Sequence, residues 1–184
     1  VFSPLRGEYL DLIAQAPLTP NIQTAFDIGT GSGVIAAILA KRGIPDIIAT
    51  DTNPKAITCA TANLKRLGLN KAVNIQSIDL FPESCADLIV CNPPWLPAKP
   101  TSAIETALYD PNHAMLAAFL NGVRHHLKPN GEAWLIISDL AEHLHLRDKD
   151  FLNQSFQTAS LNVVDILKTK PQHKKAIDES DPLA

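Results

Sequence analysis

Short apolar runs alternate with amphipathic stretches from one end of the chain to the other. The runs have the composition of buried strands, and the stretches between them carry apolar residues at helical spacing. Strands are predicted over residues 24–29, 46–51, 72–79, 86–92, 132–139 and 162–169, and helices over 8–16, 33–42, 54–67, 112–127 and within 141–158. This order predicts an α/β fold, a single doubly wound, mostly parallel sheet with helices on both faces.

Turn and cap residues agree with this assignment. Asn53 can cap the third helix, with Pro54 at its first position and Gly68 after its end. The 184 residues contain no internal repeat or domain boundary, so we expect one domain over 1–184. Because the chain starts at Val1 rather than at a methionine and ends in a polar tail, we expect it to be excised from a longer chain, with the last strand of the sheet beyond its end.

Composition narrows the functional classes. A net charge of −3 gives no general attraction to nucleic acid, and no stretch has the ~20 apolar residues that span a bilayer, so a cytoplasmic location without membrane contact is expected. The cysteines, Cys59, Cys85 and Cys91, lack C-x-x-C spacing and are interpreted as small buried apolar residues. His125 and His126 are adjacent, and His143 and His145 are two residues apart. Neither pair has the i, i+4 spacing of a helical metal pair, so no metal site is predicted.

Polar residues stand where four of the predicted strands end. Asp27 lies in the first strand just before a glycine-rich turn, and Asp51, Asp79 and Asn92 end the next three strands. In open α/β sheets ligands bind beyond the carboxyl ends of the strands. The sequence therefore places all four polar residues at one rim.

The turn after the first strand, "DIGTGSG" (27–33), contains Gly29, Gly31 and Gly33. Glycine there lets the backbone approach a ligand closely, although a tight structural turn is an alternative explanation. A dinucleotide-binding fold is the nearer rival, but its fingerprint is G-x-G-x-x-G, whereas residue 34 is Val. The spacing here is G-x-G-x-G.

The two aspartates that follow suit a nucleoside. Asp51 stands 22 residues after Gly29, where a carboxylate can accept hydrogen bonds from both ribose hydroxyls, or can simply begin the turn before the next helix. This feature fits nicotinamide and adenosyl cofactors equally. Asp79 could accept a hydrogen bond from an adenine amino group, with Leu80 and Phe81 against the ring.

The stretch "CNPPWLP" (91–97) separates these possibilities. An amide or exocyclic amino nitrogen is a poor nucleophile, because its lone pair is delocalised. The Asn92 side-chain oxygen and the Pro93 carbonyl can each accept one N–H of the same NH2 group and orient it. Pro93 and Pro94 stiffen the backbone, and Trp95 can stack on a planar substrate. A methyl group on a sulfonium is the best partner for such a nitrogen, and its transfer needs neither a metal nor a covalent intermediate.

These motifs together resemble the class I S-adenosylmethionine-dependent methyltransferases that carry an N-P-P-aromatic motif. "FDIGTGSG", "ATDTNPKAI", "SIDLF" and "IVCNPPW" occur in the family's order and spacing, so the resemblance covers roughly residues 3–140. Within that class the chain looks closest to the release-factor glutamine N5-methyltransferases and the small-domain RNA guanine N2-methyltransferases. "SPLRGEYL" (3–10) is similar to the segment before the first helix of the glutamine enzymes, and "ETALYDPNHAM" (105–115) resembles their later segment loosely.

The resemblance implies a set of site residues. S-adenosyl-L-methionine, with S-adenosyl-L-homocysteine as its product, would contact residues at the strand ends: Asp27, Gly29, Thr30, Gly31, Gly33, Asp51, Thr52, Asp79, Leu80 and Asn92. The accepting nitrogen would be held by Asn92, Pro93, Pro94 and Trp95. Trp95 replaces the family's more usual Tyr or Phe, and the family's N-terminal recognition domain is absent from the sequence.

The expected activity is N-methylation of a macromolecule. A protein glutamine, as in a release factor, is the favoured acceptor, because the N-terminal segment matches the glutamine enzymes better and the chain is mildly acidic. The alternative acceptor is an exocyclic base amine in RNA, of the guanine N2 type. More distant alternatives are an NAD-dependent oxidoreductase, which would leave N-P-P-W unexplained, and a cofactor-binding relative without activity. The sequence does not define the oligomeric state.

Overall fold

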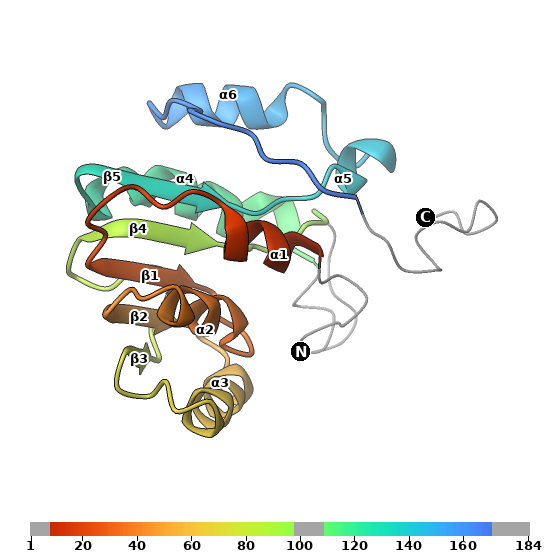
Figure 1. Ribbon diagram of the computed structural model, residues 1–184. Coiled ribbons are helices and arrows are strands. Elements are labelled where there is room, and N and C mark those ends of the chain that lie inside the picture. Colours follow the sequence, from red (N-terminus) through yellow and green to blue (C-terminus); the bar gives the residue numbers. More distant parts are fainter. Residues whose placement is uncertain (1–7, 98–108, 171–184) are drawn as a thin grey trace.

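The computed structural model describes residues 8–97 and 109–170. Within them five parallel strands form one sheet in the order β3-β2-β1-β4-β5 (Figure 1). The strands are β1 (Thr24–Ile28), β2 (Asp46–Thr50), β3 (Val73–Gln76), β4 (Ala86–Cys91) and β5 (Leu127–Leu135). The helices are α1 (Glu8–Gln15), α2 (Val34–Lys41), α3 (Pro54–Arg66), the 3-10 helix η3 (Pro111–His113), α4 (Ala114–His126), α5 (Leu140–His143) and α6 (Phe151–Thr158). The predicted doubly wound α/β fold is confirmed.

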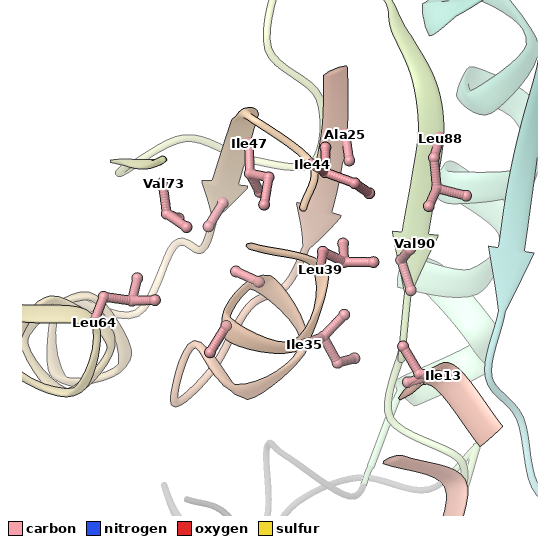
Figure 2. Packing of buried hydrophobic residues seen from close by; sticks show 13 residues of the cluster. Ile13, Ala25, Ile35, Leu39, Ile44, Ile47, Leu64, Val73, Leu88 and Val90 are labelled. Carbon is pink, nitrogen blue, oxygen red and sulfur yellow. The ribbon is translucent and has the colours of Figure 1, made fainter. Parts of the chain in front are cut away.

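One face of the sheet packs against α1, α2 and α3. Successive side chains of a strand point to opposite faces, so Ala25 of β1 and Leu88 and Val90 of β4 share this face. Figure 2 shows these side chains directed toward Ile35 and Leu39 of α2. Because these apolar side chains are buried together, they hold α2 against the sheet, immediately after the glycine turn.

The other face packs against α4 and α6. This face buries Phe26 of β1 and Ile89 of β4 together with Leu116 and Phe119 of α4. Phe26 and Ile89 are adjacent in sequence to residues that point to the first face. Phe151 of α6 packs at the edge of the same cluster. The sheet is therefore covered on both faces, which explains the almost continuous apolar sequence of β1 and β4.

Local sequence signals set several boundaries as predicted. The Asn53 side chain accepts a hydrogen bond from the backbone N–H of Lys55 at 3.0 Å, and Pro54 begins α3. Gly68 follows the helix with φ 71°. Cys91 is buried as expected, but Cys59 and Cys85 are exposed, so the interpretation of those two as buried apolar residues is wrong.

Three predictions differ from the structure in the C-terminal part. The fifth strand, predicted over 132–139, is β5 and begins five residues earlier, at Leu127, and ends at Leu135. Residues 162–169 form no strand, and Val164 is 89% exposed. A segment rich in β-branched residues becomes a strand only when a neighbouring strand supplies backbone hydrogen bonds, and Figure 1 shows this segment leaving α6 without joining the sheet. The single helix predicted within 141–158 is two helices, because His145 has φ 56° and ends α5.

Parts of the resemblance lie outside the described residues, namely segments 3–7 and 105–108, as does the polar tail. In the part of the chain that is described, no helix has both the length and the apolar character needed to cross a bilayer.

Candidate functional site

Strand register brings the predicted site residues together. Ile28, the last residue of β1, pairs with Thr50 of β2 on one side and with Cys91 of β4 on the other. The residues that follow these three, Gly29, Asp51 and Asn92, therefore leave the sheet side by side. This is the point where the chain order reverses, between β1 and β4, which is the usual ligand position in such sheets.

Asp27 stabilises the glycine turn through hydrogen bonds to residues of the turn and of α2. It is buried, and its Oδ2 accepts hydrogen bonds from the Thr30 hydroxyl at 2.6 Å and the Ala36 backbone N–H at 2.9 Å. Burial raises the pKa of Asp27 to about 6, against the opposing effect of these two hydrogen bonds. Its other oxygen is buried without a partner among the described residues. Thr30 is likewise buried, so the structure gives both side chains a supporting position in the turn.

The three glycines of the turn have different surroundings, although all have positive φ. A Cβ on Gly33 would lie 3.1 Å from the Cβ of Ala60, so this glycine permits close packing of the turn on α3. A Cβ on Gly29 would lie 2.7 Å from the Cε of Met115. Gly31 faces open space, with only the Gly29 carbonyl oxygen at 4.0 Å from its Cβ position. Gly31 is therefore where a ligand can approach the backbone most closely.

Asp51 links the glycine turn to the start of α3. Its Oδ2 accepts the Gly31 backbone N–H at 2.9 Å, and its Oδ1 accepts that of Asn53 at 2.8 Å. Each carboxylate oxygen has more than one lone pair, so both can still accept a hydroxyl donor. Asp51 is half-buried and the neighbouring Thr52 is exposed. The geometry thus suits recognition of a diol such as a ribose.

The segment after β3 joins the same rim, with one correction to the prediction. The Thr50 hydroxyl donates a hydrogen bond to the Leu80 carbonyl at 2.7 Å, which brings exposed Asp79 and half-buried Leu80 beside the end of β2. Phe81 does not face the rim. Its ring stacks on His126 of α4 with centroids 4.5 Å apart, and a Cβ on Gly122 would lie 2.6 Å from it. The expectation that Phe81 lies against an adenine ring is wrong, because its ring stacks on Phe119 and His126 of α4.

Asn92 and Trp95 contact each other at the end of β4. The indole N–H of Trp95 donates a hydrogen bond to Asn92 Oδ1 at 3.0 Å. Pro93 between them is buried, whereas Pro94 and both partners are half-buried. The Trp95 ring also meets Tyr9 of α1 edge to face, with centroids 6.2 Å apart. The two prolines thus form a fixed turn with a carboxamide and a flat ring at its ends.

Asp110 and Met115 complete the rim, and the sequence analysis did not identify either. Buried Asp110 accepts the backbone N–H groups of Met115 and Leu116 at 2.9 and 3.0 Å, and its own N–H donates to the Leu96 carbonyl at 2.7 Å. Asp110 thereby joins the end of the N-P-P-W segment to α4. An aspartate before a proline at a helix start is a cap signal that could have indicated it.

A buried charge pair beyond β5 was also missed. Arg147 is 6% exposed and donates to both Glu142 oxygens, at 2.8 and 2.7 Å, and to the Ser138 carbonyl at 2.6 Å. The ring of His113 packs at a tilt of 32° on Phe151, with centroids 4.4 Å apart, and its pKa is lowered by burial and by the charge of Arg147. Nothing local in "AEHLHLRDKD" distinguishes this arginine from a surface residue.

The rim has features that would suit a nucleoside cofactor. Across residues 8–97 and 109–170, no three His, Cys, Asp or Glu side chains gather into a group that could hold a metal ion. The open approach to Gly31, the half-buried carboxylate of Asp51 and the exposed carboxylate of Asp79 would suit an adenosyl group with a cationic tail.

Comparisons with known proteins identify related chains. A family model described as methyltransferase small domain matches residues 11–165. The tRNA1(Val) (adenine(37)-N6)-methyltransferase of Cytophaga hutchinsonii is 33% identical over 133 residues, covering 68% of this chain and 56% of that protein. The release factor glutamine methyltransferase of Cereibacter sphaeroides is 34% identical over 140 residues, covering 68% of this chain and 50% of that protein.

Among solved structures, a ribosomal protein L11 methylase from Lactobacillus delbrueckii subsp. bulgaricus superimposes with a TM-score of 0.64 at 21% identity. The match covers 88% of this chain and 71% of that one, and shows a shared fold. The chain spans about half the length of the curated relatives described above.

Proposed function

The chain belongs to the methyltransferase small domain family, and on that premise we propose that it transfers a methyl group from S-adenosylmethionine to a planar NH2 nitrogen, that of a protein glutamine side chain. The observation that carries the proposal is the position of the Asn92–Trp95 turn directly beside the glycine turn, fixed by the pairing of Ile28 with Cys91. A methyl donor at one turn would face an amine held at the other.

Residues of β1, β2 and β3 would bind the cofactor. Asp51 would accept hydrogen bonds from the ribose hydroxyls, and exposed Asp79 with Leu80 would contact the adenine. The backbone at Gly31 would leave room for the methionine part. When bound, the cofactor would supply a methyl group on a positively charged sulfur. The sulfur–carbon bond would break as the nitrogen–carbon bond forms, the methylated nitrogen would release one proton to solvent, and S-adenosylhomocysteine would remain.

Residues after β4 would orient the acceptor. The carbonyl oxygens of Asn92 and Pro93 would each accept one N–H of the same amino group, which turns its lone pair away from the conjugated system. Trp95 would cover the planar group and keep water out. The nearby Cys91 thiol is fully buried, and burial raises its pKa well above the usual range.

The relatives favour two acceptor classes. Glutamine enzymes recur among them, from Cereibacter sphaeroides and from Gloeobacter violaceus at 34% and 33% identity, which supports a glutamine acceptor. A tRNA adenine-N6 enzyme at 33% identity supports a base amine in RNA as the second candidate. Both acceptors present a flat NH2 group, so the same turn would serve either.

Replacing Asn92 tests the reaction. Asn92→Ala is expected to lower methyl transfer about 100-fold or more, the usual effect of removing one positioned polar group, while affinity for S-adenosylhomocysteine stays within a few fold. Transfer is measured with radiolabelled cofactor and affinity by calorimetry. Asn121→Ala, an exposed asparagine on α4, is the matched control and should behave as wild type. Full activity of Asn92→Ala would contradict the proposal.

The acceptor class is tested in a cell extract. The protein is incubated with labelled S-adenosylmethionine and extract, and the product is divided between protease and ribonuclease. Loss of label to protease alone supports the glutamine acceptor. Loss to ribonuclease alone establishes the RNA amine in its place.

A further inference from the structure

We propose that Trp95 is a positioning residue whose indole N–H fixes which end of the Asn92 carboxamide faces the acceptor. The inference rests on the proposed function and adds a second task to a side chain expected only to stack. Its basis is the hydrogen bond from Trp95 Nε1 to Asn92 Oδ1 at 3.0 Å.

A carboxamide has two ends of nearly equal size and opposite hydrogen-bonding character. Only the oxygen end can accept an N–H from the substrate, and a flipped Asn92 would present its own N–H groups to the amine. Among the described residues, Trp95 is the one hydrogen-bond partner of the Asn92 side chain. In the flipped form the indole N–H would face the NH2 group of Asn92, donor against donor, so the ring selects the productive orientation.

The selected oxygen remains able to bind the substrate. A carbonyl oxygen has two lone pairs, of which the indole uses one. Because the substrate would stack on the same ring, the oxygen is held on the side where the amine arrives. The edge of the indole thus orients Asn92 while its face covers the substrate, and Phe, which has no ring N–H, can do only the second.

One contact holds the ring, and a second holds the backbone next to it. Tyr9 of α1 meets Trp95 edge to face, and the carbonyl of the next residue, Leu96, accepts the buried N–H of Asp110 at 2.7 Å. The indole therefore packs on α1, and the backbone beside it is tied to the residue before η3 and α4. Such anchoring is what a residue needs if it is to keep another side chain in a single orientation.

The kinetic test compares Trp95→Phe in two backgrounds. In the wild-type background we expect kcat to fall about five- to tenfold, the effect of losing one net hydrogen bond, with KM for acceptor and cofactor changed less than twofold. In the Asn92→Asp background the same change should alter kcat less than twofold, because the two oxygens of a carboxylate are equivalent and need no selection. An unchanged kcat in the first background, or an equal loss in both, would overturn the proposal.

A spectroscopic test reads the contact without any turnover. The chain has two tryptophans, so an NMR spectrum shows two indole N–H signals. Asn92→Ala should speed solvent exchange of the Trp95 signal severalfold and leave that of Trp134, which donates to Glu132 at 3.3 Å, unchanged. An unaffected Trp95 signal would overturn the proposal. Absence of transfer by the wild-type protein to any amine acceptor would instead refute the proposed function, and this spectrum would still report on the contact.

Discussion

The two halves of the rim are held by different kinds of contact. At the ends of β1 and β2, carboxylates bind backbone N–H groups, Asp27 that of Ala36 and Asp51 that of Gly31. At the ends of β4 and β5, two pairs of side chains bind each other, Trp95 with Asn92 and Arg147 with Glu142, and Asp110 accepts backbone N–H groups as well. The first half therefore depends mainly on the course of the backbone, and the second depends more on which side chains are present.

The largest expected effect is in the second half. Arg147→Ala leaves Glu142, whose side chain is only 13% exposed, without its partner, and should lower the free energy of unfolding by about 4 kcal/mol. Urea unfolding measures it, and Arg124→Ala, an exposed arginine on α4, is the control that should stay near zero. A loss below about 1 kcal/mol would mean that the buried pair does not stabilise the rim.

Asp27 gives the next largest effect, as a pH dependence of the first half. Its pKa is raised from 3.8 to about 6 in the folded chain, so the unfolded chain ionises first as pH rises. Stability contributed by this group is full below pH 3.8 and falls by about 3 kcal/mol as pH rises to about 6. Asp27→Asn should abolish that fall, and exposed Asp148→Asn should preserve it. Parallel curves for Asp27→Asn and wild type from pH 4 to 7 would exclude a buried ionising Asp27.

Substitution of Gly33 distinguishes the effect of close packing from the effect of backbone conformation. Gly33→Ala should cost about 2 kcal/mol and weaken cofactor binding, because the new Cβ meets Ala60 at 3.1 Å and φ is 79°. Gly43→Ala is the matched control, with φ 92° and nothing within 4 Å, and should cost only about 1 kcal/mol without changing affinity. If Gly33→Ala and Gly43→Ala lost equal amounts of stability and affinity, close packing at Gly33 would not be the cause of its effect.

The smallest expected effect concerns the start of α4. Asp110→Ala removes the acceptor of two backbone N–H groups and should cost about 1 kcal/mol, with the acceptor KM raised and the cofactor affinity unchanged. Asp150 stands at the start of α6 without a side-chain cap hydrogen bond, so Asp150→Ala should be neutral. Thermal unfolding and steady-state kinetics distinguish the two. A neutral Asp110→Ala would show that water replaces the cap.

The difference between contacts to backbone groups and contacts between side chains also explains what could be predicted from the sequence. The glycine turn, the cap at Asn53 and the strand-end position of Asp51 are local patterns, because their partners are backbone groups that every sequence supplies. The packing of Phe81 on α4 and the burial of Arg147 depend on side chains brought together only by the fold. Residues 162–169 show the same limit for a strand, since their apolar pattern says nothing about a partner.

The hydrogen bond between Asp110 and Leu96 has a consequence for engineering. It joins the two ends of the segment between the N-P-P-W turn and α4, and Leu96 and Tyr109 also pair as a short parallel bridge. Leu96 is thereby tied to the two residues that precede η3 and α4. A designed change that shifts α4 along the sheet is therefore expected to displace the N-P-P-W turn with it, so the two should be redesigned as one unit.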